Sequence, residues 1–318
     1  FCGSILAAIT AVGTIMMPKM LEQGYPRPFV IVLAASAALL EALIPPSNAA
    51  ILFSALTNVP VSQTFAAGVI PGLILLVFMV IVVLIKCRNI RNPEPASAAE
   101  RWRSFLGALP GLFTPIIILG GIYAGLLTPS ESAAVAGVWA IVMGFFIYRE
   151  LTFASLCLAL KETATITAII FAIIATATFL SVVLTYSQIP QQIVSYFTDM
   201  GATFALFWVA LAIICLLLGT FVEIVPVFYL TVPIFAAITL SFNQSLLHLY
   251  VVFVAFAGIG MITPPVCVGI YTSASVIQEN PAKAFREVPL FVGVGILYGI
   301  LMILIPEAST WLPSLLTR

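Results

Sequence analysis

Uncharged apolar runs of about 20 residues recur along this chain, and each is long enough to cross a bilayer core of roughly 30 Å. The 318 residues are 62% hydrophobic and 8% charged, whereas soluble domains hold about 25% charged residues. No soluble core could bury this much apolar surface, so we predict an all-α, polytopic membrane protein. The continuous runs are Phe65–Ile85, Phe105–Leu127, Ala133–Tyr148, Ile166–Leu184 and Val288–Ile305.

Two further apolar stretches are interrupted near their middles by a pair of prolines. The stretch Phe29–Leu56 is interrupted at Pro45-Pro46, and Leu249–Ile277 is interrupted at Pro264-Pro265. A proline inside a helix removes one N–H donor and clashes with the carbonyl four residues earlier. Both stretches are therefore predicted to be broken helices.

Each break frees backbone groups that need a partner in a membrane interior. The carbonyls ahead of a break carry partial negative charge and suit Na⁺. The N–H groups behind it carry partial positive charge and suit a carboxylate. Ser47, Asn48 and Thr263 lie at the breaks and could add side-chain contacts. We therefore interpret the breaks as a binding site, with a kink that binds nothing as the alternative.

The two breaks belong to an internal repeat. Pro45 follows Ser4 by 41 residues, and Pro264 follows Glu223 by the same number. The apolar stretch Phe204–Leu240 is too long for one span, so we interpret it as a re-entrant hairpin with its tip near Glu223. An even number of spans and one hairpin separate the breaks, so the second broken helix runs opposite to the first. This inverted repeat is typical of secondary transporters.

Glu41 and Glu223 are acidic residues deep in apolar sequence, where carboxylates are costly and usually functional. Glu41 lies about one helical turn before Pro45. Our hypothesis is that Glu41 supplies a cation ligand or accepts a proton. A protonated glutamate held by a neighbouring helix is the alternative. Glu223 is interpreted as a ligand at the hairpin tip, because the repeat places it opposite Ser4.

The basic residues predict the orientation, because cytoplasmic loops are enriched in Lys and Arg. They crowd the loop 86–103, which we expect to be cytoplasmic, and the stretch 186–202 without Lys or Arg reads as periplasmic. Alternating spans place Lys19, Arg27, Arg149, Lys161, Lys283 and Arg286 on the cytoplasmic side as well. We interpret the tryptophans at positions 102, 139, 208 and 311 as anchors at the membrane interface.

Several classes of function are disfavoured. The formal net charge is zero, so nothing points to a nucleic-acid partner. The five cysteines are scattered, and the single His248 has no partner to build a metal site or a catalytic triad. No motif of an intramembrane enzyme is found, so we expect no catalytic residue and no cofactor. A purely structural subunit would leave the two breaks unexplained.

Five segments occur in the order of a known family. They are Phe1-Cys2-Gly3-Ser4 followed by Ala11-Val12-Gly13-Thr14, then Leu43-Ile44-Pro45-Pro46-Ser47, Phe65-Ala66-Ala67-Gly68-Val69-Ile70-Pro71-Gly72-Leu73, Gly120-Gly121-Ile122-Tyr123-Ala124-Gly125-Leu126-Leu127-Thr128-Pro129-Ser130-Glu131 and Gly260-Met261-Ile262-Thr263-Pro264-Pro265-Val266. Together they resemble the large, DctM-like membrane subunit of the tripartite ATP-independent periplasmic (TRAP) transporters, over essentially the whole chain.

The resemblance implies an elevator-type importer of a small organic anion, such as a dicarboxylate or sugar acid, in the bacterial inner membrane. It implies Na⁺ as the coupling ion, a small membrane subunit and a periplasmic substrate-binding protein as partners. By analogy, one cation site lies near Ser4 and the other near Glu223. The first would be framed by Gly3, Ser4 and the residues before Pro45. The second would be framed by Gly219, Thr220, Glu223, Gly260 and Thr263.

The chain departs from the family pattern at the first site. Ile5 and Ala8 replace a serine and an aspartate of the usual tip, Glu41-Ala42 replaces Gly-Pro, and Glu223 replaces an aspartate. These changes leave the number of Na⁺ ions open. A stand-alone carboxylate:cation symporter of the divalent-anion type, without a binding protein, is the alternative function.

The resemblance also divides the chain. Residues 1–60 would hold the first hairpin tip and broken helix of a transport domain, and residues 61–202 scaffold-type spans. Residues 203–285 would hold the second hairpin and broken helix, and residues 286–318 a C-terminal span. The chain begins without Met inside an apolar segment, so we interpret it as truncated at its N-terminus.

Overall fold

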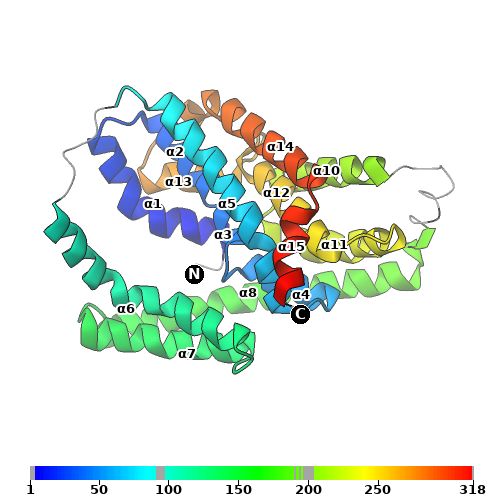
Figure 1. Ribbon diagram of the computed structural model, residues 1–318, viewed down its shortest axis with the longest axis horizontal. Coiled ribbons are helices and arrows are strands. Elements are labelled where there is room, and N and C mark those ends of the chain that lie inside the picture. The colour runs from blue at the N-terminus through cyan, green and yellow to red at the C-terminus, as the bar shows by residue number, and fades with distance from the viewer. Residues whose placement is uncertain (1–3, 91–96, 190, 193–194, 196–203, 317–318) are drawn as a thin grey trace. The chain divides into compact units, whose positions relative to one another are not determined.

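The structure is a computed structural model, and it describes residues 4–90, 97–189, 191–192, 195 and 204–316. Every regular element among these residues is a helix (Figure 1), as predicted. Gly3, residues 91–96 of the basic loop and most of the segment 190–203 lie outside the described residues. Six described helices are long and apolar enough to cross a membrane, and two bent pairs pass the same test when each is joined. The chain is therefore a helical, multi-pass membrane protein.

The chain forms two compact units, one of residues 1–91 and 177–318 and the other of residues 92–176. The predicted division into transport domain and scaffold concerns motion, and it stays a prediction. The first unit contains α1 (Ile5–Glu22), α2 (Arg27–Ala37), α3 (Leu40–Leu43), α4 (Asn48–Thr57), α5 (Val61–Lys86), α10 (Phe204–Phe221), α11 (Ile224–Ser241), α12 (Leu246–Ile262), α13 (Val268–Val276), η2 (Pro281–Arg286), α14 (Val288–Leu304) and α15 (Glu307–Leu316).

Both Pro-Pro pairs break a helix, as the sequence predicts. The segment Arg27–Leu43 and the following helix α4 are bent by 43° at the first pair. Helix α12 ends at Ile262, and α13 resumes at Val268 beyond the second pair. Both Pro-Pro peptide bonds are cis.

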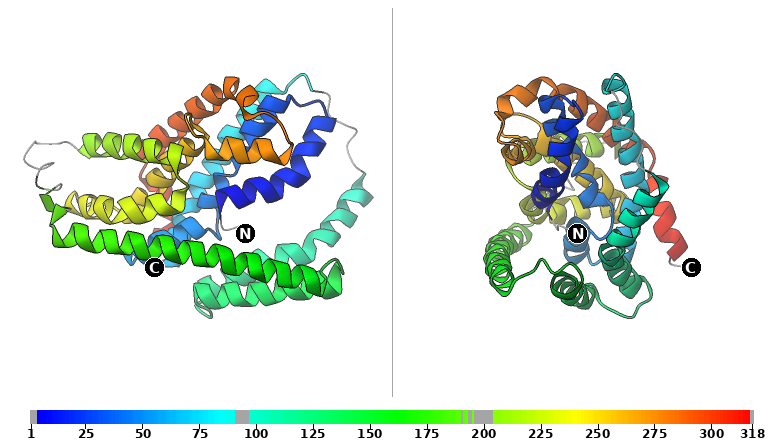
Figure 2. Two further views of the ribbon diagram at one scale, coloured as in Figure 1. Left: turned by 180° about the vertical axis from the view of Figure 1, so that it is seen from behind. Right: turned by 90° about the vertical axis from the view of Figure 1, so that its left-hand side faces the viewer.

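The interrupted stretch around Glu223 forms two helices that meet at a tip. Helix α10 ends at Phe221 and α11 begins at Ile224, and the two run in opposite directions beside each other (Figures 1 and 2). The tip points toward the interior of the first unit, where α10 also packs along α12. The helical hairpin is as the sequence predicts, and its re-entrant course in the membrane stays a prediction.

Helix α12 forms the centre of the first unit. Its residues from His248 to Ile262 are all buried, because the helix is apolar on every side and packs against α5, α10, α11 and α14. Phe253 of α12 stacks on Phe228 of α11 with ring centroids 4.6 Å apart. A buried aromatic pair of this kind contributes about 0.5–1.5 kcal/mol beyond its buried area.

One predicted interfacial anchor is wrong. Trp208 of α10 is 1% exposed, and its ring packs edge-on against His248 at 4.7 Å. His248 is itself buried and shares a hydrogen bond of 3.1 Å with Ser309 through its Nδ1. Trp208 therefore belongs to the core, because α12 packs along α10 and places His248 against its ring.

Helix α5 shows how the first unit meets both core and lipid. Gly68 lies under the first break, where an added Cβ would lie 2.0 Å from the Leu43 carbonyl oxygen. Toward its end, Leu84 and Ile85 are 65% and 70% exposed. One face of α5 thus supports the break, and the other is apolar and open, as expected of a helix that faces lipid.

Ion pairs gather where α2 and α14 begin. Glu279 pairs with Arg27 at 3.2 Å and with Lys283 at 2.8 Å. Glu287 pairs with Lys86 at 2.8 Å. These contacts place basic residues predicted to lie on one membrane side in two sets of ion pairs within the first unit.

The second unit holds α6 (Ala98–Tyr123), α7 (Pro129–Val142), η1 (Met143–Ile147) and the first part of α8 (Phe153–Tyr186). Thr128 and Glu131 form a reciprocal cap at the start of α7, as the Thr-Pro-Ser-Glu sequence suggests. Trp139 of α7 donates to the Pro110 carbonyl of α6 at 3.1 Å. None of the residues of α6 is buried.

Candidate functional site

The two residues that the repeat relates, Ser4 and Glu223, are in contact. The Ser4 hydroxyl donates a hydrogen bond to Oε1 of Glu223. Each residue is the N-cap of its helix, α1 or α11, yet neither side chain caps its own helix. Each side chain instead turns to its counterpart in the other repeat. The contact therefore joins the two residues that the predicted repeat relates.

The hairpin tip lies against the end of α12 through two glycines. An added Cβ on Gly260 would lie 2.7 Å from the Gly219 Cα, and one on Gly219 would lie 2.2 Å from the Ala257 carbonyl oxygen. No side chain fits at either position. Thr220 donates to the Leu217 carbonyl at 2.7 Å. Gly219 and Gly260 thus allow the tip to lie close to the second break, and their role as ligands stays a prediction.

At the first break, the carbonyl of Ala42 has hydrogen-bond donors from two side chains. Pro46 has no N–H to offer the Ala42 carbonyl four residues earlier. Instead, Ser47 donates its hydroxyl to this oxygen at 2.9 Å, and the hydroxyl of Tyr250 from α12 donates to it as well. Ser47 also accepts from the Ala50 N–H and so caps α4. Asn48 follows as the first residue of α4.

At the second break, the hydrogen bonds of Thr263 go to carbonyls of the preceding helical turn. Thr263 donates its hydroxyl to the Ile259 carbonyl at 2.7 Å, and its N–H to the Gly260 carbonyl at 2.8 Å. Pro264 and Pro265 are exposed, whereas Pro45 and Pro46 are half-buried. The two breaks therefore share a plan but differ in how their carbonyls are satisfied.

Glu41 places a carboxylate beside the first break. Its Oε1 is buried and has no hydrogen-bond partner among the described residues. Glu41 lies close enough to Glu223 and to Tyr250 for its charge to act on both. A buried carboxylate oxygen without a partner is unfavourable unless it holds a proton or a cation.

Glu41 and Glu223 bring two carboxylates near the tips. No Lys or Arg lies within ten residues of Ser4, Glu41, Glu223 or Pro264 in the sequence. The contacting groups are carboxylates, hydroxyls and carbonyls, which are the oxygen ligands that hard cations prefer. The arrangement can therefore receive a cation at the tips.

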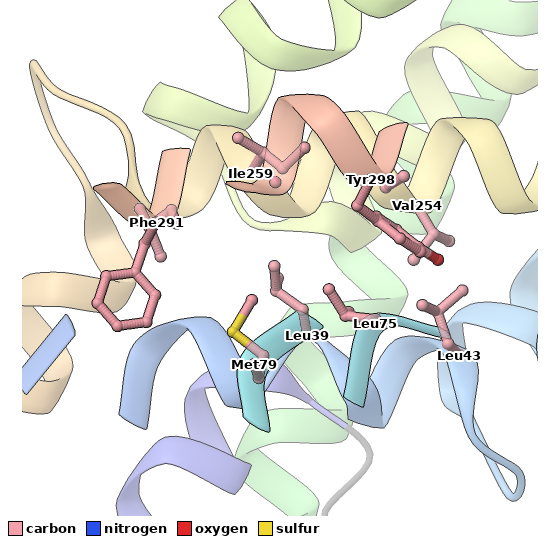
Figure 3. A pocket seen from close by; sticks show the side chains of 11 residues that line it. Leu39, Leu43, Leu75, Met79, Val254, Ile259, Phe291 and Tyr298 are labelled. Carbon is pink, nitrogen blue, oxygen red and sulfur yellow. The ribbon is translucent and has the colours of Figure 1, made fainter. Parts of the chain in front are cut away.

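A small cavity lies near the breaks, between the Leu39–Leu43 turn, α5, α12 and α14 (Figure 3). Leu75, Met79, Val254 and Phe291 are among its apolar lining residues, and Tyr298 adds a hydroxyl. Its free volume is about 10 Å³, near the least that can hold one water molecule. This cavity is too small for a molecule much larger than water.

The sequence-based prediction did not include Tyr250. Tyr250 lies in an apolar run, and no repeat or proline marks it. A signal was present, because a tyrosine in a fully apolar helix needs a hydrogen-bond acceptor once buried. The partner, Ala42, is 208 residues away and could not be identified from the sequence.

A comparison with protein families matches residues 1–308 to the tripartite ATP-independent periplasmic transporter, DctM component. The match runs through both breaks, both N-caps of the tips and both units.

Characterised relatives agree with this match. The C4-dicarboxylate TRAP transporter large permease protein DctM of Pseudomonas aeruginosa is 34% identical over 314 residues, which cover 98% of this chain and 74% of the relative. The ectoine/5-hydroxyectoine TRAP transporter large permease protein UehC of Ruegeria pomeroyi is 32% identical, with 98% and 74% covered. The sialic acid TRAP transporter large permease protein SiaM of Vibrio cholerae is 28% identical, again with 98% and 74% covered.

Proposed function

Because the chain belongs to the DctM family of tripartite ATP-independent periplasmic transporters, we propose that it is the large membrane subunit of a cation-coupled importer of a small organic anion. The family is one of transporter permeases, so the chain is not an enzyme. The names of two relatives refer to acids, a C4-dicarboxylate and sialic acid. Their chemistry supports a dicarboxylate or a sugar acid as the cargo.

The observation that carries the proposal is the Ser4–Glu223 hydrogen bond between the tips, beside two helix breaks. In this proposal the coupling cation is Na⁺, bound near Ser4 and near Glu223 by hydroxyl, carboxylate and carbonyl oxygens. The N–H groups at the starts of α4 and α13, together with Ser47, Asn48 and Thr263, receive the carboxylate of the substrate. Positive helix ends suit this group.

Coupling to a cation gives the import its driving force. The membrane potential contributes about 2.3 kcal/mol per charge per 100 mV. Import of an anion against this potential needs co-transported positive charge in excess of the anion's own charge. Glu41 and Glu223 are the groups we assign to hold that charge.

The architecture we propose is an inverted repeat that works as an elevator. Each half contains a hairpin arm, a broken helix and a proline-initiated span, and the two tips meet at Ser4 and Glu223. Residues 1–60 and 203–285 would move together as the transport domain. The spans of residues 61–202 and 286–318 would include the scaffold.

We also propose the partners and the orientation. A small membrane subunit would bind the large subunit, and a periplasmic binding protein would deliver the substrate. The chain would lie in the bacterial inner membrane with residues 86–103 on the cytoplasmic side. Its positively charged residues there, including Lys86 and Arg101, support this orientation.

Uptake by the reconstituted permease tests the proposal. Proteoliposomes would be supplied with labelled C4-dicarboxylate or sialic acid, with or without an inward Na⁺ gradient, and with or without a periplasmic binding protein. We expect uptake that needs both the gradient and the binding protein. Uptake that needs the gradient alone would favour a stand-alone divalent-anion symporter. Uptake that ignores the gradient would contradict cation coupling.

A further inference from the structure

Tyr250 connects both repeats at the first break. Its side chain is 0% exposed. Its ring lies 5.3 Å from the ring of Phe53 in α4 and is stacked on Phe228 of α11 at 6.5 Å. Tyr250 itself belongs to α12, the first half of the second broken helix. Its ring therefore contacts both the first broken helix, through α4, and the second hairpin, through α11.

The hydroxyl of Tyr250 fixes the last turn before the break. It donates to the Ala42 carbonyl, which also accepts the Ser47 hydroxyl at 2.9 Å. A carbonyl oxygen has two lone pairs, and both are engaged by these donors. The Ala42 carbonyl, although freed by Pro46, is therefore closed to a cation.

The residue next to Ala42 is Glu41, whose Oε1 is buried without a hydrogen-bond partner among the described residues. Helix α3 has only four residues, so its position depends on what anchors its end. The Tyr250 hydroxyl provides that anchor from another helix. Holding Ala42 consequently holds the backbone of Glu41.

The second break lacks this arrangement. The repeat places Ile31 in the position that corresponds to Tyr250, and isoleucine carries no hydroxyl. The Thr263 hydroxyl there bonds to the Ile259 carbonyl within its own helix. The anchor from a distant helix is thus a property of the first break, where the repeat pairs Glu41 with Gly260.

We propose that Tyr250 is a positioning residue for ion coupling: it closes the Ala42 carbonyl and holds Glu41 so that the side chain, rather than the backbone, receives the coupling cation. This inference rests on the cation coupling proposed above. It goes beyond that proposal by closing the Ala42 carbonyl to the cation and by assigning the placement of Glu41 to a hydroxyl from α12.

The matched test compares two tyrosines. Tyr250→Phe removes a hydroxyl that anchors Ala42, whereas Tyr298→Phe removes a hydroxyl of an equally buried residue that has no hydrogen-bond partner among the described residues. Initial uptake by the complete reconstituted permease would be measured against Na⁺ concentration at saturating substrate. We expect Tyr250→Phe to raise the half-saturating Na⁺ concentration roughly three- to tenfold, the effect of one lost hydrogen bond, and Tyr298→Phe to leave it unchanged.

A second measurement separates positioning from general damage. The KM for the substrate at saturating Na⁺ should stay within twofold in Tyr250→Phe, because the anchor acts on the cation ligand. If Tyr250→Phe does not fold, Ser47→Ala removes the other donor to the same carbonyl and should shift the Na⁺ dependence in the same direction. Because Ser47 is also proposed to contact the substrate, only the Na⁺ dependence at saturating substrate is compared for this variant.

The outcomes distinguish the two proposals. Wild-type uptake that does not depend on Na⁺ would overturn the coupling itself. Na⁺-dependent uptake in which Tyr250→Phe, or Ser47→Ala in its place, behaves like Tyr298→Phe would overturn the role of Tyr250 alone. A raised KM for the substrate without a change in Na⁺ dependence would also overturn it.

Discussion

Ser4 and Glu223 are 219 residues apart in the chain and share a hydrogen bond, and 219 is also the offset of the internal repeat. Each residue is therefore bonded to its own counterpart. Because each leaves its helix start uncapped, the contact replaces two local caps by one bond between the repeats. The two tips consequently form one structural element.

The bond between the tips predicts a measurable coupling. A double-mutant cycle with Ser4→Ala and Glu223→Ala should give an interaction energy of about 1.5 kcal/mol, the lower end of the range for a hydrogen bond to a charged group, because both residues are only half-buried. Thermal unfolding in detergent measures it. The control cycle pairs Ser4→Ala with Glu22→Ala at the far end of α1, about 27 Å away, and should be additive. Additivity in both cycles would contradict the bond.

The glycine contact at the second break predicts a steric effect. Gly219→Ala and Gly260→Ala should each lower stability by about 2 kcal/mol or more, because the new Cβ meets backbone atoms that cannot move aside. Gly293→Ala in α14 is the control, since nothing lies within 4 Å of its added Cβ. It should be neutral or stabilise by up to about 1 kcal/mol. The melting temperatures of the three purified variants test this, and equal values would refute the close approach.

The buried Oε1 of Glu41, which has no hydrogen-bond partner among the described residues, predicts that a substitution here changes the Na⁺ dependence of uptake. Glu41→Gln removes the charge but keeps the shape, so the variant should fold and lose most of its uptake stimulation by Na⁺. The control is Glu22→Gln, because Glu22 is exposed at the end of α1, and its uptake should match the wild type. Uptake by Glu41→Gln with an unchanged cation dependence would assign this residue a structural role.

The ion pairs of Glu279 predict a dependence of stability on pH. Glu279 lies outside the spanning helices, and its pKa is lowered from 4.5 to about 2 by a hydrogen bond from Lys283, then by the Asn280 N–H and by Arg27. A lowered pKa contributes stability above the unfolded value that is lost as the pH falls through the folded value.

Glu279→Gln should therefore be less stable than the wild type at pH 7, and the difference should shrink between about pH 4.5 and 2. Unfolding measured from pH 7 to 2 tests this. High salt should also reduce the difference at pH 7, because the pairs are exposed. A difference that persists unchanged at pH 2 would rule out this origin.

Much of the fold follows from one-dimensional patterns. The apolar runs determined that the chain spans a membrane, since run length compares directly with bilayer thickness. The proline pairs determined where two helices break, because a missing N–H interrupts a helix whatever surrounds it. The equal spacing from Ser4 to Pro45 and from Glu223 to Pro264 predicted a repeat. The position of Trp208 was predicted wrongly because a tryptophan in an apolar run fits both a membrane interface and a protein core.

The sequence by itself thus determined the membrane class, the breaks and the correspondence of Ser4 with Glu223. Only the tertiary structure decided that Ser4 and Glu223 touch, that Tyr250 closes the Ala42 carbonyl, and that Glu41 Oε1 stays without a hydrogen-bond partner among the described residues. The physical reason is that helix periodicity and proline chemistry act within a few residues of the chain. The partners of a buried hydroxyl or carboxylate are instead set by how distant helices pack.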